Sequence, residues 1–230
     1  LDLEEERALG EALKVQGRRI TPTLIKYAEH NSYMADSRKA LREQALAHGE
    51  AVKVDGSEVE ATLVHVDADA EAKLVTSLLY RFVHQPYAEV FERVQRMGDE
   101  ERRAIIDLAL ERLGPHDIPV RELEMVDYTF ELLMDYGAYR EYKRHRMQTY
   151  LPQPLMVANG YVIPPVVTDA GLQPDFEAAM RTAEDAFRTV QEGQSRQVGM
   201  AEYLVTHAHK RRVLCKLNLR QCYHLFKLRT

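Results

Sequence analysis

The feature that most constrains this chain is a short basic stretch at which a helix has to end. Arg144 and Arg146 flank His145 at the end of a helix predicted for residues 137–146. Consecutive side chains on a helix point in different directions, so these three can converge on one ligand only where the helix stops. The segment 151–154 that follows contains two prolines, which forbid a helix and predict an extended loop.

The residues of this stretch, considered alone, leave more than one interpretation open. The planar guanidinium of arginine gives paired, charge-assisted hydrogen bonds that suit a phosphate. The same charges would also complement the carboxyl end of a helix dipole on a solvated surface, without any ligand. A nucleic-acid-binding surface would add Arg140, Lys143 and the basic run 210–212. That alternative is the least favoured because the net charge is −5.

Composition places the chain among ordinary globular proteins. Its 230 residues are 45% hydrophobic and 29% charged, enough for one large domain with a core. No apolar run approaches the roughly 20 residues that span a bilayer, and no signal peptide is visible. The two cysteines, Cys215 and Cys222, lack metal-type spacing, which predicts buried thiols and a reduced, cytoplasmic setting. The chain begins with Leu1, so we expect a processed or truncated piece of a longer protein.

The first fifty residues are predicted to form a helical arm. Asp36 or Ser37 can cap its last helix, and Thr21 with Pro22 is a typical helix start. A β-hairpin over residues 51–64 should follow, because Asp55-Gly56 separates two strand-like segments. The helices expected in the arm cover residues 2–15, 23–33 and 36–48.

Residues 51–230 are predicted to form an α+β domain. Asp67 can cap a helix whose apolar residues recur at helical spacing and should be core: Leu74, Val75, Leu78, Leu79 and Phe82. Further helices are expected over residues 86–97, 99–113, 137–146, 175–191 and 201–207, with a last one from Asn218, which can cap it. The helix over 175–191 carries Met180 and Phe187 on its apolar face. A strand is expected over residues 123–134, and a turn at Asn159-Gly160 should precede a short strand over 161–163. Residues 212–217 predict a strand or a buried turn.

Two sequence blocks resemble the signature of the flavin-dependent thymidylate synthases. The Arg-His-Arg stretch at 144–146, followed by Thr149, is similar to the start of that family's motif, Arg-His-Arg-x-x-Ser-x-Asn-Glu-x-Ser-x-Arg. A second block has the family's spacing of Asn-x-Arg, then His or Asn, then Arg, in Asn218, Arg220, His224 and Arg229. The strand 127–130 is a looser third match. The matches extend from about Glu60 to Thr230, and leave the N-terminal arm outside.

The resemblance implies a fold, an activity and a set of site residues. The fold is a mainly antiparallel, twisted sheet flanked by long helices. The activity is methylene transfer from methylenetetrahydrofolate to dUMP and its reduction by FAD hydride, with NADPH as electron source and sites shared in a homotetramer. Arg229 would contact the pyrimidine of dUMP and is the candidate catalytic residue. The residues implied to bind FAD are Arg144, His145, Arg146, Thr149, Asn218, Arg220 and His224, with His116 as a looser candidate.

The expected dUMP site departs from the family pattern. Two phosphate-binding arginines are replaced by Met156 and Glu202, and an acid beside a phosphate repels it. Glu141 stands where the family commonly has Gln. The motif's Asn, Glu and second Ser are replaced by Leu151, Pro152 and Pro154. Enzymatic activity is therefore left open, and the alternative is a non-catalytic flavin-binding or structural half of a larger or oligomeric protein.

No metal site is predicted from the sequence. His207 and His209 would lie on one side of an extended segment, which makes them a possible metal-binding pair. A structural or catalytic zinc site needs at least three protein ligands, and no third ligand is evident near them. We therefore expect no metal ion at this pair.

Overall fold

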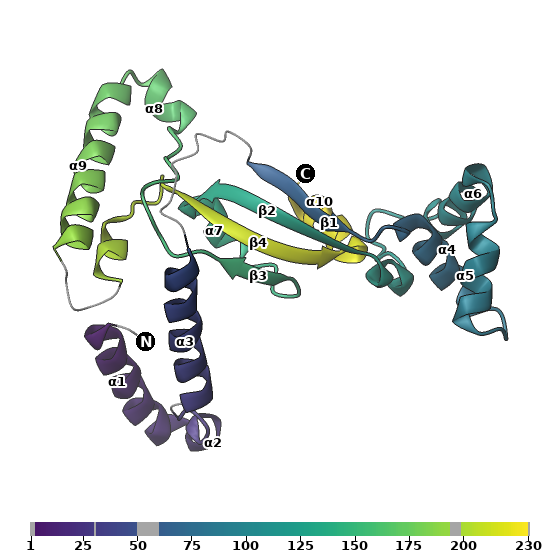
Figure 1. Ribbon diagram of the computed structural model, residues 1–230, viewed down its shortest axis with the longest axis horizontal. Helices are drawn as coiled ribbons and strands as arrows, with labels where there is room; N and C mark the ends of the chain where they lie inside the picture. Colours follow the sequence, from purple (N-terminus) through teal and green to yellow (C-terminus); the bar gives the residue numbers. More distant parts are fainter. Residues whose placement is uncertain (1–2, 30, 50–59, 194–198, 230) are drawn as a thin grey trace. The chain divides into compact units, whose positions relative to one another are not determined.

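The computed structural model describes residues 3–29, 31–49, 60–193 and 199–229, without the side chain of Arg229. The chain divides into two compact units, residues 1–56 with 155–209, and residues 57–154 with 210–230 (Figure 1). Residues 155–209 thus group with the N-terminal segment. The expected division into an arm over 1–50 and a domain over 51–230 stays a prediction. Among the described residues, no helix is both long and apolar enough to cross a membrane.

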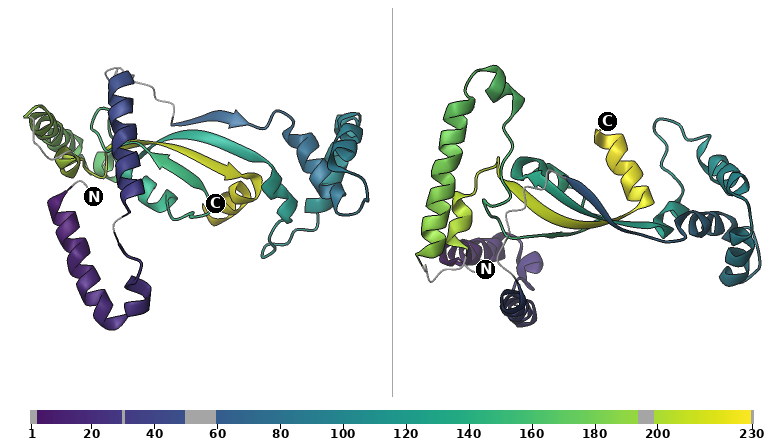
Figure 2. Two further views of the ribbon diagram at one scale, coloured as in Figure 1. Left: turned by 60° about the horizontal axis from the view of Figure 1, so that its bottom comes forward. Right: turned by 45° about the horizontal axis from the view of Figure 1, so that its top comes forward.

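The second unit is built on a four-stranded antiparallel sheet with the order β1-β2-β4-β3. The sheet is twisted, and β2 and β4 are its long central strands (Figure 2). In β4 the side chains of Val213, Cys215 and Leu217 are buried while Leu214 and Lys216 are exposed, the period of two that a one-sided core requires. The strands are β1 (Ala61–Val66), β2 (Asp127–Asp135), β3 (Thr149–Pro152) and β4 (Lys210–Asn218).

Helices complete the second unit. One buried cluster joins the first two helices of this unit, α4 and α5, and consists of Ala72, Val75, Val90 and Val94. A second cluster connects α4 to the chain segment that enters β2 and consists of Leu74, Leu123 and Val126. The helices are α4 (Ala70–Tyr80), α5 (Tyr87–Gln95), α6 (Asp99–Leu110), the 3-10 helix η1 (Arg121–Met125), α7 (Tyr136–Tyr142) and α10 (Leu219–Arg229).

Some details predicted for the second unit were wrong. Phe82 is 83% exposed because α4 ends at Tyr80 and the chain turns away from the core there. Asp67 does not cap α4; its carboxylate accepts hydrogen bonds from Lys73 Nζ at 2.8 Å and from the backbone N–H of Asp127 at 3.2 Å. The predicted strand 123–134 begins only at Asp127, after η1.

The first unit is helical in its described part. The side chain of Asn31 caps α3 by accepting a hydrogen bond from Met34 N at 3.1 Å, so the cap is not Asp36 or Ser37. The predicted helix 23–33 stops at Ile25. The longest helix buries Met180 and Phe187 on its inner face, as its spacing predicted. The helices are α1 (Glu4–Ile20), α2 (Pro22–Ile25), α3 (Ser32–His48), α8 (Pro165–Asp169), α9 (Gln173–Glu192) and the 3-10 helix η2 (Met200–Leu204).

Three further predictions concern short segments. Most of the hairpin predicted for residues 51–64 lies outside the described residues, and β1 pairs with β2. The helix predicted for residues 201–207 is the shorter 3-10 helix η2. Gly160 has φ +71°, as the predicted turn before Tyr161 requires, but the strand after it is reduced to one bridge between Tyr161 and His209.

Candidate functional site

Antiparallel pairing brings the two sequence blocks to one end of the sheet. Asn218, at the end of β4, pairs with Asp127 at the start of β2, and Thr149, at the start of β3, pairs with Lys216 near the end of β4. Because β3 begins where β4 ends, the chain before β3 and the helix after β4 meet at the same sheet end. The Arg-His-Arg block and the Asn-x-Arg block are therefore neighbours in space, although they are distant in sequence.

The Arg-His-Arg block lies on a series of turns, which we call the 143–148 turn. The carboxylate of Asp135 caps α7 by accepting a hydrogen bond from Ala138 N at 2.9 Å. The helix ends at Tyr142 instead of continuing to Arg146. The N–H of His145 then donates to Tyr142 O at 3.1 Å, an i to i−3 bond that tightens the chain after the helix. Because the helix ends before the block, the three side chains are not held in the diverging directions of a single helix.

The two arginines of the turn differ in their surroundings. Arg144 Nη2 lies 2.9 Å from Glu141 Oε1, but its side chain is 71% exposed, so this pair stabilises the turn little. Arg146 is exposed and makes no hydrogen bond or ion pair with the other residues that the structure describes. Arg146 is therefore the cation of the block that an incoming anion can approach without displacing a protein partner.

The two histidines expected at the cofactor lie next to each other. The ring of His145 stands edge-on to the ring of His224, with 6.4 Å between centroids and 82° between the planes. His145 is half-buried and also lies near Tyr142, whereas His224 is exposed on α10. Two residues singled out from separate sequence blocks thus share one environment.

Asn218 caps α10, as its position in the sequence predicted. Its Oδ1 accepts a hydrogen bond from Gln221 N at 2.9 Å, and Gln221 Oε1 accepts one from Asn218 N at 2.9 Å. This reciprocal pair is a capping box. The Nε2 of Gln221 also donates to Met147 O at 2.6 Å, which links α10 to the 143–148 turn. Sequence reasoning missed Gln221, although the Asn-x-x-Gln spacing was a signal for it.

Arg220 connects α10 to the loop that carries His116. Its Nε donates to Pro119 O at 2.9 Å, and its Nη1 donates to Glu124 Oε1 at 2.7 Å. The Nζ of Lys227 holds the same loop through Asp117 O at 3.1 Å. Arg220 therefore has a structural function that its expected role at the cofactor does not include. His116 is exposed on this loop.

The phenol and thiols beneath the site are buried and neutral. Burial raises the pKa of Tyr142 above its ordinary range, and the neighbouring thiol of Cys215 adds to the effect. Burial likewise raises the pKa of the thiols of Cys215 and Cys222. A thiol with a raised pKa is a poor nucleophile. These groups therefore provide no thiolate for covalent chemistry.

A shallow apolar cavity lies beside α10. Its volume is about 460 Å³. It opens between α10 and residues 113–115, which follow α6 and lead into the loop that Arg220 and Lys227 hold. Its lining consists of Leu113, Gly114, Pro115, Tyr223, Phe226 and Lys227.

The residues expected around dUMP are divided between the two units. Leu151 is 59% exposed, and Pro152 belongs to the edge strand β3, a position that tolerates a residue without an N–H. Met156 and Glu202 belong to the first unit, and their expected roles stay predictions. The side chain of Arg229 lies outside the described part of the chain.

The positions of His207 and His209 do not support the metal-binding alternative. Among the described residues, no group of three or more His, Cys, Asp or Glu side chains is placed to hold a metal ion. Of the histidine pair named from the sequence, His209 is buried and His207 is exposed. The two imidazoles therefore differ in their access to any ion.

Comparison with known proteins identifies the class. The family model of the thymidylate synthase complementing proteins matches residues 62–230. The chain therefore belongs to this family, as the two motif blocks indicated. The match begins in β1 and includes the rest of the sheet and every residue of the candidate site.

Curated relatives of this chain are longer proteins. A UPF0159 protein of Chlamydia muridarum is 29% identical over 238 residues, which cover 100% of this chain and 44% of that protein. A UPF0159 protein of Thermoplasma acidophilum is 28% identical over 160 residues, which cover 69% of this chain and 32% of that protein. The chain thus spans less than half the length of these relatives.

Two solved structures are similar to this chain. The UMP/dUMP methylase PolB of Streptomyces cacaoi, bound with 5-Br UMP, matches with a TM-score of 0.50 and 16% identity over 72% of this chain and 73% of that one. The flavin-dependent thymidylate synthase ThyX of Helicobacter pylori, complexed with FAD and dUMP, has a TM-score of 0.45 and 15% identity over 74% and 84%. The first likeness supports the mixed helix and antiparallel sheet fold.

Proposed function

We propose that this chain binds FAD at the sheet end where the 143–148 turn, the start of α10 and the 114–119 loop meet, and that its dUMP subsite is altered. One observation carries the proposal. Two blocks that resemble flavin-binding motifs, one before β3 and one after β4, come together there, with 6.4 Å between the rings of His145 and His224. Such a meeting is what a shared ligand requires, because both blocks have to reach it at once.

The side chains at this sheet end fit a dinucleotide. Arg144 and Arg146 are exposed and offer planar guanidinium groups to a pyrophosphate. The imidazoles of His145 and His224 add donors, and the cavity beside α10 offers apolar walls to a ring. FAD, when bound, would supply the hydride for reducing a transferred methylene group. The protein supplies position and charge.

In this proposal, the altered dUMP subsite binds dUMP only weakly. Exposed Leu151 and half-buried Pro152 stand in β3 where polar motif residues are expected. Glu141, at a position where the family commonly has Gln, is engaged by Arg144 at 2.9 Å. The arginines expected at the positions of Met156 and Glu202 would each pair with the phosphate of dUMP. Removing one partner of a desolvated charge pair costs about 2–5 kcal/mol of binding free energy. Methylenetetrahydrofolate and NADPH would be used only if the chain catalyses the reaction.

A second candidate is a non-catalytic flavin-binding or structural half of a larger or oligomeric protein. The favouring observation is that the chain spans 44% of the Chlamydia muridarum relative. A longer protein has room for a second segment that could carry the phosphate-binding residues missing from this one. In that protein, this chain would hold flavin and the other segment would bind the nucleotide.

A flavin titration tests the proposal. The purified chain should bind FAD, and Arg146→Gln should weaken binding by about tenfold to a hundredfold, the effect of losing a hydrogen bond to a charged group. Arg103→Gln is the matched control, because Arg103 is also exposed, on α6, and has no ion pair or hydrogen bond among the described residues. A wild-type chain that binds no flavin, or equal affinity in both variants, would contradict the proposal.

Calorimetry with dUMP on the flavin-loaded chain tests the altered subsite, and a turnover assay separates the two candidates. Tight dUMP binding would contradict the altered subsite. Turnover with methylenetetrahydrofolate and NADPH would support the enzyme, whereas flavin binding without turnover would support the non-catalytic half.

A further inference from the structure

Gln221 is a residue whose side chain contacts both halves of the candidate site. Its Oε1 accepts a hydrogen bond from the backbone N–H of Asn218, at the start of α10, at 2.9 Å. Its Nε2 donates to the backbone oxygen of Met147, in the 143–148 turn, at 2.6 Å. One amide group therefore caps a helix with its oxygen and holds a distant turn with its nitrogen.

An amide can do both because the two partners are of opposite kinds. Asn218 N offers a donor and needs an acceptor, whereas Met147 O offers an acceptor and needs a donor. Glutamate at this position would keep the cap, since the third helical position of a capping box takes Glu as well as Gln. Glutamate would lose the bond to Met147 O, because an ionised carboxylate cannot donate.

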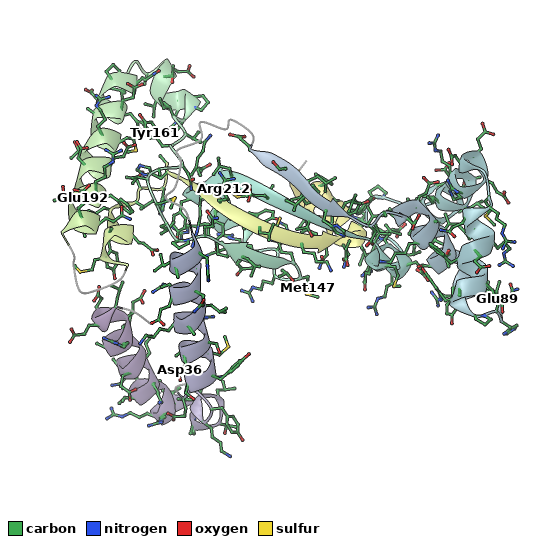
Figure 3. All side chains as sticks on the ribbon, in the orientation of Figure 1. Asp36, Glu89, Met147, Tyr161, Glu192 and Arg212 are labelled. Carbon is green, nitrogen blue, oxygen red and sulfur yellow. The ribbon has the colours of Figure 1, made fainter. Side chains whose placement is uncertain are left out.

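The rest of the 143–148 turn is largely open to solvent. Arg144 and Arg146 are exposed, and Met147 is 84% exposed, with its side chain projecting from the turn (Figure 3). The Nε2 of the buried Gln148 donates to Tyr142 O at 3.3 Å, but that bond reaches only the end of α7. The Gln221 bond and the edge-on ring contact between His145 and His224 connect the turn to α10.

We propose that Gln221 is a positioning residue that sets the distance between the Arg-His-Arg block and the Asn-x-Arg block, so that one flavin phosphate group can be reached from both. The inference rests on the proposed function. A ligand bound by both blocks gains affinity when their separation is set beforehand, because the loss of conformational freedom on binding is smaller. The residue matters through what it positions and does not itself contact the ligand.

The sharpest test is Gln221→Glu, compared with Gln95→Glu. Gln95 is exposed at the end of α5 and makes no side-chain hydrogen bond among the described residues, so its variant carries the same charge change. In the chain without ligand, hydrogen exchange of the amides of residues 144–149 should become roughly three- to tenfold faster in Gln221→Glu, the effect of one hydrogen bond. Exchange in α10 should stay unchanged, because the cap remains. The affinity for FAD should fall by about tenfold or more.

Gln221→Met separates position from charge. Met has a similar size, adds no charge and cannot donate, so FAD binding should weaken as in Gln221→Glu, although the helix also loses half of its capping box. Unchanged exchange of residues 144–149 in Gln221→Glu would overturn the inference. Faster exchange with unchanged FAD affinity would also overturn it. If the wild-type chain bound no FAD, the proposed function would fail on that titration, and exchange would still decide whether Gln221 holds the turn.

Discussion

At the scale of single residues, His209 is the most constrained side chain in the first unit. It is fully buried. Thr206 N donates to His209 Nδ1 at 3.1 Å, so Nδ1 acts as acceptor and the proton of the neutral ring lies on Nε2. That nitrogen lies 3.8 Å from Glu184 Oε1, and Arg188 pairs with the same carboxylate. The ring of Tyr161 covers the imidazole edge-on. His209 thus connects α9 to the segment that leads into β4.

This environment predicts a pH-dependent stability. Burial lowers the pKa of His209 below its ordinary value of 6.5, although Glu184 opposes the shift. The unfolded chain therefore binds this proton at a higher pH than the folded chain. The contribution of buried, neutral His209 to the free energy of unfolding should be complete above about pH 6.5. It should be lost as the pH falls toward the lower pKa that His209 has in the folded state.

The measurement is the denaturation midpoint at about pH 7.5 and about pH 5.5. His209→Asn should keep the bond with Thr206 and should reduce the drop in midpoint on acidification. His84→Asn, at an exposed histidine, is the control and should leave that drop unchanged. An equal drop in His209→Asn would show that other groups cause the acid sensitivity.

At the scale of elements, β4 does most to organise the site. It pairs with β2 on one side and with β3 on the other, and its end leads directly into α10. Its alternating burial fixes which side chains face the helices and which face outward. A shift of one residue in this strand would exchange the two faces and would separate Asn218 from the 143–148 turn.

Two neighbouring residues of β4 test this organisation. Val213 is fully buried, and Val213→Ala should lower the free energy of unfolding by about 1–3 kcal/mol through lost burial and a residual cavity. Leu214 is 37% exposed, and Leu214→Ala should cost less than about 1 kcal/mol. Urea denaturation measures both. Equal costs would mean that the outer face of the strand is covered as well.

At the scale of the whole molecule, the N-terminal helices leave apolar surface open. Neither α1 nor α3 contains a buried residue, and α1 exposes Leu9, Leu13 and Ile20. Large apolar side chains that gather on an exposed surface often mark a site of protein–protein contact. The resemblance of the motif blocks to the flavin-dependent thymidylate synthases also implies sites shared between subunits.

We expect the chain to form a homo-oligomer, and specifically a tetramer. Light scattering at micromolar concentration and moderate salt should give about four times the mass of 26.5 kDa. Leu13→Glu should shift the distribution toward smaller species if α1 contributes to the interface, because it places a charge on the apolar face of that helix. Glu11→Gln, at an exposed polar position of the same helix, is the control and should leave the mass unchanged. A monomer of the unaltered chain under these conditions would contradict the expectation.

Local sequence determined the elements whose signals are local. The spacing of Met180 and Phe187 predicted a long amphipathic helix, and Asn218 predicted the cap of α10. Both depend on residues within a few positions of each other, so a pattern in the chain is sufficient. The family motifs likewise singled out the residues of the candidate site before any contact was known.

Only the tertiary structure decided which of these residues meet. The ring contact between His145 and His224 and the bond from Gln221 to Met147 depend on the pairing of β4 with β2 and β3. Strand pairing joins residues far apart in sequence, and no local pattern encodes the partner. The early end of α7 and the burial of His209 have the same origin, because tertiary contacts outweigh helix propensity and set the solvent access of each side chain.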